Sequence, residues 1–161
     1  MENSLILVVE DEPEISVIIV SYLKAAGFRT ILAGDGDMAF AMHQQMKPDL
    51  ILLDIKIPKR DGIDVLRDIR KLSYTPIIML TAMAEDIEKI SALRLGADDY
   101  ILKLYKGIET NKIPYGKMID EQINKLTGMN SSANWTQCMQ TNSTYLDCPV
   151  ATHNDSSPMS V

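Results

Sequence analysis

The chain has 161 residues, 46% of them hydrophobic, which is enough for one buried core and leaves little length for a second domain. Its formal net charge of -6 disfavours nucleic-acid binding, which needs clustered Lys and Arg side chains. The N-terminus has no signal-peptide pattern, and no apolar stretch approaches the roughly 20 residues that cross a bilayer. We therefore expect a cytoplasmic protein without membrane contact.

The first half of the chain alternates short apolar runs with helical stripes. Leu5–Val9 is an apolar run rich in branched residues, which is typical of a strand buried on both faces. Pro13 suits the first turn of the helix that follows, and Gly27 suits its end. This half is completed by a predicted strand at Phe28–Ala33 and a predicted helix at Asp35–Met46.

The same alternation continues to Lys103. The turn Asp61-Gly62 opens a helix, and Gly96 suits the end of the next one. In chain order, the expected elements are a strand at Leu50–Leu53 ending at Asp54, a helix that carries Ile63, Leu66, Ile69 and Arg70, a strand at Pro76–Leu80 ending at Thr81, a helix that carries Ile87, Ile90 and Leu93, and a strand at Tyr100–Leu102 ending at Lys103.

Alternating apolar strands and helices predict an α/β fold, in which helices cover both faces of a doubly wound, five-stranded parallel sheet. Ligand sites of such sheets lie beyond the carboxyl ends of the strands, near the point where the strand order reverses. The residues at those positions are three carboxylates, a hydroxyl and an ammonium, namely Glu10, Asp11, Asp54, Thr81 and Lys103. We expect these side chains to meet at one edge of the sheet.

These residue types suit Mg²⁺-dependent phosphoryl transfer. Mg²⁺ prefers oxygen ligands, commonly joins carboxylates to phosphate, and offsets the repulsion among crowded carboxylates. We expect Asp11 and Asp54 to bind Mg²⁺ directly, and Glu10 directly or through water. A carboxylate can attack phosphorus and form an acyl phosphate. The Lys103 ammonium and the Thr81 hydroxyl would then contact phosphoryl oxygens.

Taken one at a time, these residues also have structural explanations. Glu10 and Asp11 could simply favour the positive N-terminal end of the next helix. Asp54 could be a turn residue, and Thr81 a helix cap. Their order at successive strand ends is what favours a functional site. His43 has no catalytic partner near it in the sequence, and we expect a surface or half-buried side chain.

Several segments resemble response-regulator receivers: Val9-Glu10-Asp11-Glu12, Asp54-Ile55-Lys56-Ile57-Pro58, Asp61-Gly62, Met79-Leu80-Thr81-Ala82 and Gly96-Ala97-Asp98-Asp99-Tyr100-Ile101-Leu102-Lys103. The last segment is similar to the OmpR/PhoB branch, to regulators of the BaeR or AdeR kind. The resemblance covers roughly residues 5–103 and implies the flavodoxin/CheY-like receiver fold. It also implies the following roles: Asp54 as phosphoacceptor, Glu10 and Asp11 as the acidic pair, the Lys56 backbone carbonyl as a metal ligand, Thr81 and Lys103 as the phosphate-sensing pair, and Tyr100 as the aromatic switch residue.

The sequence departs from this family after Lys103, where the family has a proline and then an amphipathic fifth helix. Leu104 stands at the proline position, and we expect a trans bond because a cis bond before a residue other than proline costs ~2.5–4 kcal/mol. A helix at Tyr115–Leu126, opened by Pro114, is the candidate replacement. We divide the chain into a receiver core at 1–103, an atypical fifth-helix region at 104–126, and a polar tail at 127–161 that is expected to be disordered, with no DNA-binding output domain.

The resemblance predicts a two-component receiver that takes a phosphoryl group from a sensor histidine kinase, in phosphorelay signalling derived from a transcription-regulator family. It predicts a signalling protein rather than an enzyme that releases products. Two alternatives stay open: a DNA-binding transcriptional regulator, and a receiver-like protein that binds partners without being phosphorylated. Homodimerisation through the fourth helix and fifth strand is also implied, because Arg94, Asp98 and Asp99 match that pairing surface.

Overall fold

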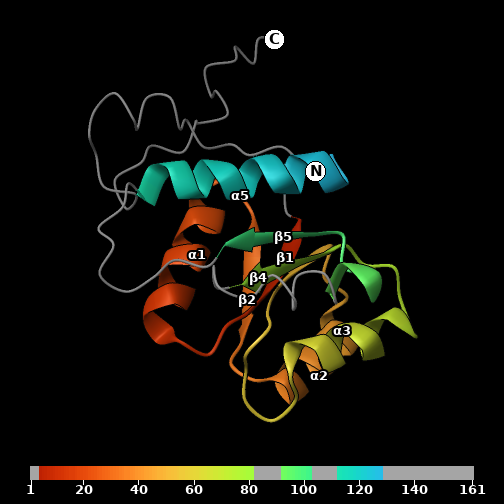
Figure 1. Ribbon diagram of the computed structural model, residues 1–161. Coiled ribbons are helices and arrows are strands. Elements are labelled where there is room, and N and C mark those ends of the chain that lie inside the picture. The colour runs from red at the N-terminus through yellow and green to blue at the C-terminus, as the bar shows by residue number, and fades with distance from the viewer. Residues whose placement is uncertain (1–3, 82–91, 103–111, 129–161) are drawn as a thin grey trace.

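The computed structural model of the chain describes residues 4–81, 92–102 and 112–128, with the backbone alone for 81, 102 and 112–118 (Figure 1). In chain order its elements are β1 (Leu5–Val9), α1 (Pro13–Ala25), β2 (Arg29–Ala33), α2 (Gly36–Met46), β3 (Leu50–Asp54), α3 (Gly62–Arg70), β4 (Ile77–Thr81), β5 (Asp99–Leu102) and α5 (Lys112–Thr127). The predicted strand boundaries at β2, β4 and β5 differ from these by a single residue.

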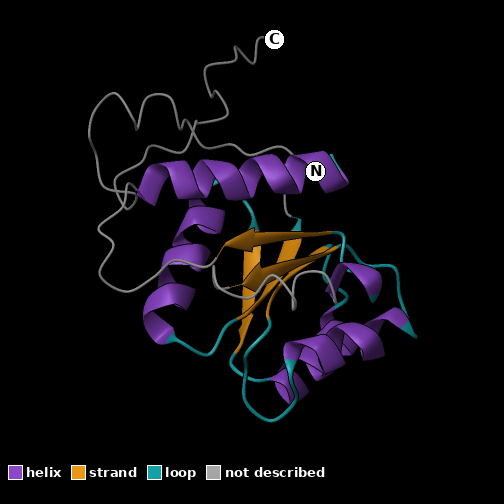
Figure 2. Cartoon of the chain, in the orientation of Figure 1, coloured by secondary structure: helices purple, strands orange, loops and turns teal. Residues whose placement is uncertain are grey.

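Five parallel strands form one sheet in the order β2-β1-β3-β4-β5. Helices lie on both sides of the sheet (Figure 2), so the predicted doubly wound, five-stranded fold is confirmed. The chain leaves β1 toward β2 on one side and later returns to β3 on the other. The strand order therefore reverses between β1 and β3, and sheets of this kind bind ligands at the carboxyl ends of the strands beside such a reversal.

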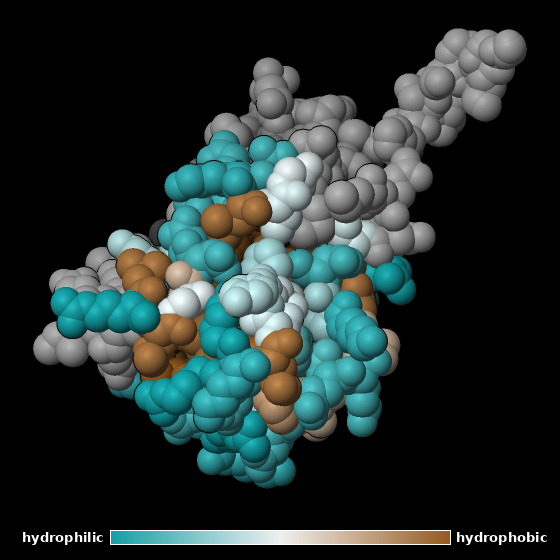
Figure 3. Space-filling view, turned by 90° about the vertical axis from the view of Figure 1, so that its right-hand side faces the viewer, coloured by the Kyte–Doolittle hydropathy of each residue, from teal (hydrophilic) through white to brown (hydrophobic). Residues whose placement is uncertain are grey.

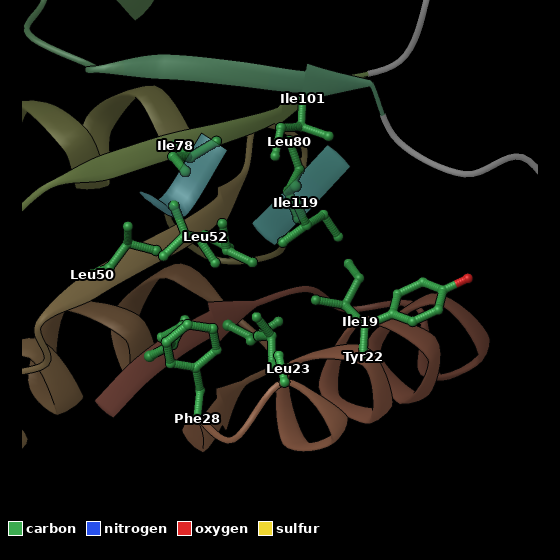
Figure 4. Packing of buried hydrophobic residues seen from close by; sticks show 14 of the residues in the cluster. Ile19, Tyr22, Leu23, Phe28, Leu50, Leu52, Ile78, Leu80, Ile101 and Ile119 are labelled. Atoms are coloured by element: carbon green, nitrogen blue, oxygen red, sulfur yellow. The ribbon is translucent and has the colours of Figure 1, made fainter. Parts of the chain in front are cut away.

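Two hydrophobic layers cover the opposite faces of the sheet, since successive side chains of a strand point to opposite sides. In β1, Ile6 and Val8 belong to the layer beneath α1 and α5, whereas Leu7 and Val9 belong to the layer beneath α2 and α3. Figure 4 shows the first layer, in which α1 and α5 side chains pack on those of β3 and β4. Each fully buried Leu or Ile contributes ~1.5–3 kcal/mol relative to an exposed one.

The helix predicted at Tyr115–Leu126 is present as α5, which contacts α1 and covers the same face of the sheet (Figure 1). Ile119 and Ile123 are fully buried in the layer that α1 and α5 share. The helix begins at Lys112, so Pro114 is its third residue rather than its first. Still within the first turn, Pro114 removes only an amide that has no intrahelical acceptor.

Side-chain caps fix the starts of α2 and α3. The Asp35 carboxylate accepts a 2.8 Å hydrogen bond from the Met38 amide, and the Asp61 carboxylate accepts a 2.7 Å bond from the Ile63 amide. Each satisfies one of the amides that a helix leaves open at its N-terminus. Asp35 therefore caps α2 instead of forming its first residue.

The expectation of a surface or half-buried His43 is wrong. His43 is only 7% exposed, and its Nε2 lies 3.3 Å from the Thr75 Oγ1. Burial, with a smaller contribution from the Arg70 guanidinium, holds the pKa of His43 below its usual 6.5. The sequence shows no sign of this burial, because Thr75 and Arg70 lie far from His43 along the chain.

Part of the predicted pattern lies outside the described residues. The helix expected to carry Ile87 and Ile90 falls largely on 82–91, and Lys103, Leu104 and the residues from 129 onward are likewise not described. The described end of that helix stops as predicted. Gly96 has a φ of 108°, its amide donates to the Leu93 carbonyl at 3.2 Å, and left-handed backbone of this kind favours glycine.

The described surface includes eight exposed large hydrophobic side chains, among them Val17, Leu72 and Tyr74. On the face shown in Figure 3, hydrophobic atoms form small separate groups among hydrophilic ones. Among helices within the described ranges, none is both long enough and apolar enough to cross a membrane.

Candidate functional site

A cluster of three carboxylates lies at the carboxyl edge of the sheet. Ligand oxygens of Glu10, Asp11 and Asp54 all lie within 4.8 Å of one another. Glu10 and Asp54 are 2% and 3% exposed, whereas Asp11 is exposed. The predicted meeting of these side chains is therefore present, with two carboxylates buried and one open to solvent.

The topology of the sheet brings the cluster together. β1 and β3 are neighbours with Val9 paired to Leu53, so the residues that follow Val9 lie beside Asp54. The Glu10 amide continues the β1–β2 ladder with a 3.1 Å bond to the Ala33 carbonyl. The Glu10 Oε1 accepts a 2.9 Å bond from the Glu12 amide, which fixes the carboxylate at the turn into α1.

Asp54 is held by the backbone that follows it. The Lys56 amide donates to the Asp54 Oδ1 at 3.3 Å, and the Ile55 amide donates to the Leu80 carbonyl of β4, also at 3.3 Å. The chain then turns back, so that the Gly62 amide donates to the Ile55 carbonyl at 2.8 Å. The carboxylate is thus fixed at the start of a short closed loop.

Gly62 is required by the close approach of α3 to the end of β3. A Cβ at this position would lie 2.2 Å from the Asp54 carbonyl oxygen and 2.8 Å from the Ile55 Cα. Backbone atoms cannot yield as the tip of a side chain can, so only glycine fits here. The Asp61-Gly62 pair that marks the helix start in the sequence therefore also fixes the backbone of Asp54.

The donor set fits a hard divalent cation. Every donor is a carboxylate oxygen, and oxygen ligands are those that Mg²⁺ prefers. Three carboxylates this close repel one another, and a cation among them offsets that repulsion. Exposed Asp11 leaves the cluster accessible to a hydrated ion.

The other predicted site residues are placed only in part. The β4 backbone ends at Thr81, one strand away from Asp54 and at the same edge of the sheet, and Thr81 pairs with Leu102 of β5. The Thr81 side chain and all of Lys103 lie outside the described residues. Tyr100, on β5, is 38% exposed.

A set of charges that sequence reasoning missed ties the loop after Asp54 to α2. The Lys59 ammonium lies 3.4 Å from the Asp35 carboxylate, and the Arg60 guanidinium lies 3.3 Å from the Asp37 carboxylate. The Met38 amide and, to a lesser extent, the Lys59 ammonium hold the pKa of Asp35 below its usual 3.8. No sequence motif marks these pairs, because the partners are separated by a strand and come together only in the folded sheet.

Comparison with known proteins decides the family. The family model described as "Response regulator receiver domain" matches residues 6–112. The chain belongs to this family. Its predicted membership is confirmed, and the match extends past residue 103, where the sequence motifs stop.

Individual relatives agree with the branch that the sequence indicated. The receiver is 45% identical over 100 residues to the transcriptional regulatory protein BaeR of Escherichia coli. The aligned region covers 62% of this chain and 42% of BaeR. The BeF₃-activated receiver domain of RstA from Klebsiella pneumoniae superposes with a TM-score of 0.61 and 38% identity, covering 65% of this chain and 89% of that domain. The chain thus spans less than half of the BaeR sequence.

One solved structure bears on the metal. The receiver domain of a sensor histidine kinase from Pseudomonas aeruginosa has a magnesium ion coordinated in its active-site cleft. It superposes with a TM-score of 0.67 and 29% identity, covering 79% of this chain and 99% of that domain. Magnesium binding is therefore compatible with this fold, and the acidic cluster supplies a suitable donor set in this receiver.

Proposed function

We propose that this receiver accepts a phosphoryl group on Asp54 from a sensor histidine kinase, in a Mg²⁺-dependent reaction. The observation that carries the proposal is the set of three carboxylates whose oxygens lie within 4.8 Å of one another at the strand-order reversal. The bond that forms joins an Asp54 oxygen to phosphorus. The bond that breaks joins phosphorus to the kinase histidine, whose ring nitrogen keeps the electron pair.

Each residue of the cluster has a part in this reaction. Asp11 and Asp54 would hold Mg²⁺ directly, Glu10 directly or through water, and the Lys56 carbonyl would complete the protein ligands. When bound there, the ion would supply positive charge to neutralise the phosphoryl oxygens. The Lys56 amide, 3.3 Å from the Asp54 Oδ1, and the closed loop keep the attacking carboxylate in place. A carboxylate that is already oriented toward phosphorus lowers the activation barrier of phosphoryl transfer, because less conformational entropy is lost in reaching the transition state.

Thr81, Lys103 and Tyr100 are proposed to report phosphorylation. The Thr81 backbone lies at the same edge as Asp54, which supports a hydrogen bond from its hydroxyl to a phosphoryl oxygen. Lys103 follows β5 in the sequence and would supply a positive charge. Contacts that exist only after phosphorylation shift the balance between two conformations, and the half-exposed Tyr100 would move with that shift.

The output of the switch is a further part of the proposal. BaeR is a transcriptional regulatory protein, and this receiver would act in the cytoplasm in a phosphorelay that controls transcription. Its net charge of -6 disfavours direct contact with nucleic acid. Pairing of two copies would use the predicted face around Arg94 and Asp99. Asp98 is already engaged within the chain, because its carboxylate accepts a 2.9 Å bond from Arg70 and a 2.8 Å bond from the Ile77 amide.

Intact-mass measurement tests the phosphoacceptor directly. The full chain is incubated with Mg²⁺ and acetyl phosphate, beside Asp54→Asn and the matched control Asp64→Asn, whose carboxylate pairs with Arg67 on the exposed side of α3. The expected result is one phosphoryl adduct in the wild type and in Asp64→Asn, and none in Asp54→Asn or in EDTA. An adduct that persists in Asp54→Asn would contradict the assignment. So would its absence from a folded wild type, which would favour the alternative of a receiver that binds partners without phosphorylation.

A further inference from the structure

The loop that follows Asp54, residues 55–61, carries the Lys56 carbonyl. Backbone bonds fix its two ends, from the Ile55 amide to the Leu80 carbonyl and from the Gly62 amide to the Ile55 carbonyl. Between these ends the backbone takes an unfavourable shape, since Lys59 has a φ of 67° in the left-handed region. Additional contacts are therefore needed to hold the middle of the loop in one conformation.

Those contacts come from α2. The Gly36 amide donates a 3.1 Å bond to the Pro58 carbonyl, and a Cβ on Gly36 would lie 2.0 Å from the Arg60 carbonyl oxygen. The start of α2 thus packs directly on the loop backbone. Lys59 adds its ion pair with the α2 cap Asp35 at 3.4 Å.

Arg60 makes the widest set of contacts. Its Nε lies 3.3 Å from the Asp37 Oδ1 of α2, and its Nη1 lies 3.2 Å from the Asp68 Oδ2 of α3. The guanidinium also sits over the Phe40 ring, with its Cζ 4.9 Å from the ring centroid. The other carboxylate oxygen of Asp68, Oδ1, lies 3.4 Å from the Lys71 Nζ. Arg60 therefore bridges two helices across the loop that carries the Lys56 carbonyl.

We propose that Arg60 is a positioning residue for the metal site, because its bridge between α2 and α3 holds the loop residues that complete the site. This inference rests on the proposed function, in which the Lys56 carbonyl and Asp54 are metal ligands. The side-chain contacts of Arg60 are with Asp37, Asp68 and Phe40 rather than with the carboxylate cluster. Arg60 acts by restricting the loop, so that less ordering is left to occur when the cation binds.

The sign of the effect separates positioning from simple electrostatics. Removing a positive charge from the neighbourhood of an acidic site strengthens cation binding by Coulomb's law. Loss of a positioning residue weakens cation binding, because the loop must then become ordered when the cation binds, and the entropy lost reduces the affinity. Arg67→Met is the matched control, since Arg67 also pairs with an aspartate, Asp64 at 2.9 Å, and makes none of the described contacts to the loop.

The experiment measures the Mg²⁺ affinity of the full, unphosphorylated chain by following the backbone amide signals of Asp11 and Lys56 during a Mg²⁺ titration. We expect Arg60→Met to raise the Kd about fivefold, and Arg67→Met to leave it unchanged or lower it slightly. Arg60→Lys keeps one ion pair but loses the two-sided bridge, and should restore part of the affinity. The ratio of the Kd values of Arg60→Met and the wild type should shrink in 1 M NaCl, where partly exposed ion pairs are screened.

An unchanged or lower Kd in Arg60→Met overturns the positioning role while leaving the proposed function intact, provided the wild type binds Mg²⁺. A wild type that shows no Mg²⁺ response overturns both. If Arg60→Met does not fold, Phe40→Leu is measured in its place, because it removes the ring beneath the guanidinium without changing any charge. A Kd equal to that of the wild type then counts against the inference.

Discussion

The two ends of the central sheet hold charged groups in opposite ways. At the amino end, Arg70 donates to the Gly96 and Thr75 carbonyls, both at 2.8 Å, and to the Asp98 carboxylate at 2.9 Å. That carboxylate in turn accepts from the Ile77 amide at the start of β4. At the carboxyl end, carboxylates of like charge converge at the ends of β1 and β3 instead.

The difference separates charged groups that stabilise the fold from the carboxylates that are proposed to bind Mg²⁺ and accept phosphate. Opposite charges with good hydrogen-bond geometry stabilise the amino end without any ligand. Like charges at the carboxyl end repel one another, and a cation among them would offset that repulsion. Removing a charged group should therefore lower the free energy of unfolding at the amino end and raise it at the carboxyl end.

The largest effect should come from Gly62→Ala, at the carboxyl end. The new Cβ would overlap the Asp54 carbonyl oxygen, so the start of α3 must move, and we expect a loss of at least ~3 kcal/mol in the free energy of unfolding. Urea unfolding measures it. The control is Gly34→Ala, because a Cβ there meets nothing within 4 Å and should change stability by no more than ~0.5 kcal/mol. Equal losses in the two variants would contradict the close packing of α3 on the backbone of Asp54.

Arg70→Met should be the most damaging single change at the amino end. It leaves the Thr75 and Gly96 carbonyls and the Asp98 carboxylate without this donor, and we expect a loss of ~2–3 kcal/mol. Arg67→Met removes an ion pair whose side chains are about half exposed, and should cost under ~1 kcal/mol. Chemical unfolding of both variants without Mg²⁺ makes the comparison. Similar losses in the two variants would show that the Arg70 hydrogen bonds contribute no more to stability than an exposed ion pair does.

Asp54→Asn should increase the free energy of unfolding, in contrast to the two substitutions above. It removes one of the crowded charges while keeping the shape of the side chain, so the free energy of unfolding in EDTA should rise by ~1 kcal/mol. Asp64→Asn, which loses an exposed pairing partner on α3, should give no gain. Greater stability in Asp64→Asn than in Asp54→Asn would show that the carboxyl end is not under charge repulsion.

The smallest effect should be the pH dependence of stability due to His43. Its pKa is lowered in the folded state by burial and by Arg70, so the folded state resists protonation. The wild type is then fully stable above the unfolded value of 6.5 and loses stability as the pH falls toward the depressed folded value. His43→Gln, which keeps a side-chain nitrogen for Thr75, should lose less between pH 7 and 5. Parallel stability curves for the two proteins would contradict this.

Most of the fold could be predicted because its signals are local. Short apolar runs and the residues that flank them predicted all five strands, and the Asp61-Gly62 turn predicted the start of α3. The replacement helix was also visible, since Ile119 and Ile123 lie on one stripe and pack on α1. Pro114 misled the boundary, because proline is tolerated throughout the first turn and does not specify its first residue.

The acidic cluster was predictable for a different reason, namely that topology carries strand ends to one edge of the sheet. No comparable rule predicts which side chains come into contact when they lie far apart in the sequence. The burial of His43 and the bridge made by Arg60 depend on which side chains distant helices and loops bring together, and nothing in the local sequence encodes that. The roles of Thr81 and Lys103 stay predictions.

The most direct test of the carboxyl end as a cation site is the thermal unfolding of the wild type and of Asp54→Asn with and without Mg²⁺. A ligand that binds only the folded state stabilises it, by ~2.7 kcal/mol when its concentration is about 100 times the Kd. We predict that Mg²⁺ raises the Tm of the wild type by several degrees and that Asp54→Asn loses most of this increase. The account is contradicted if Mg²⁺ shifts both proteins equally, or shifts neither.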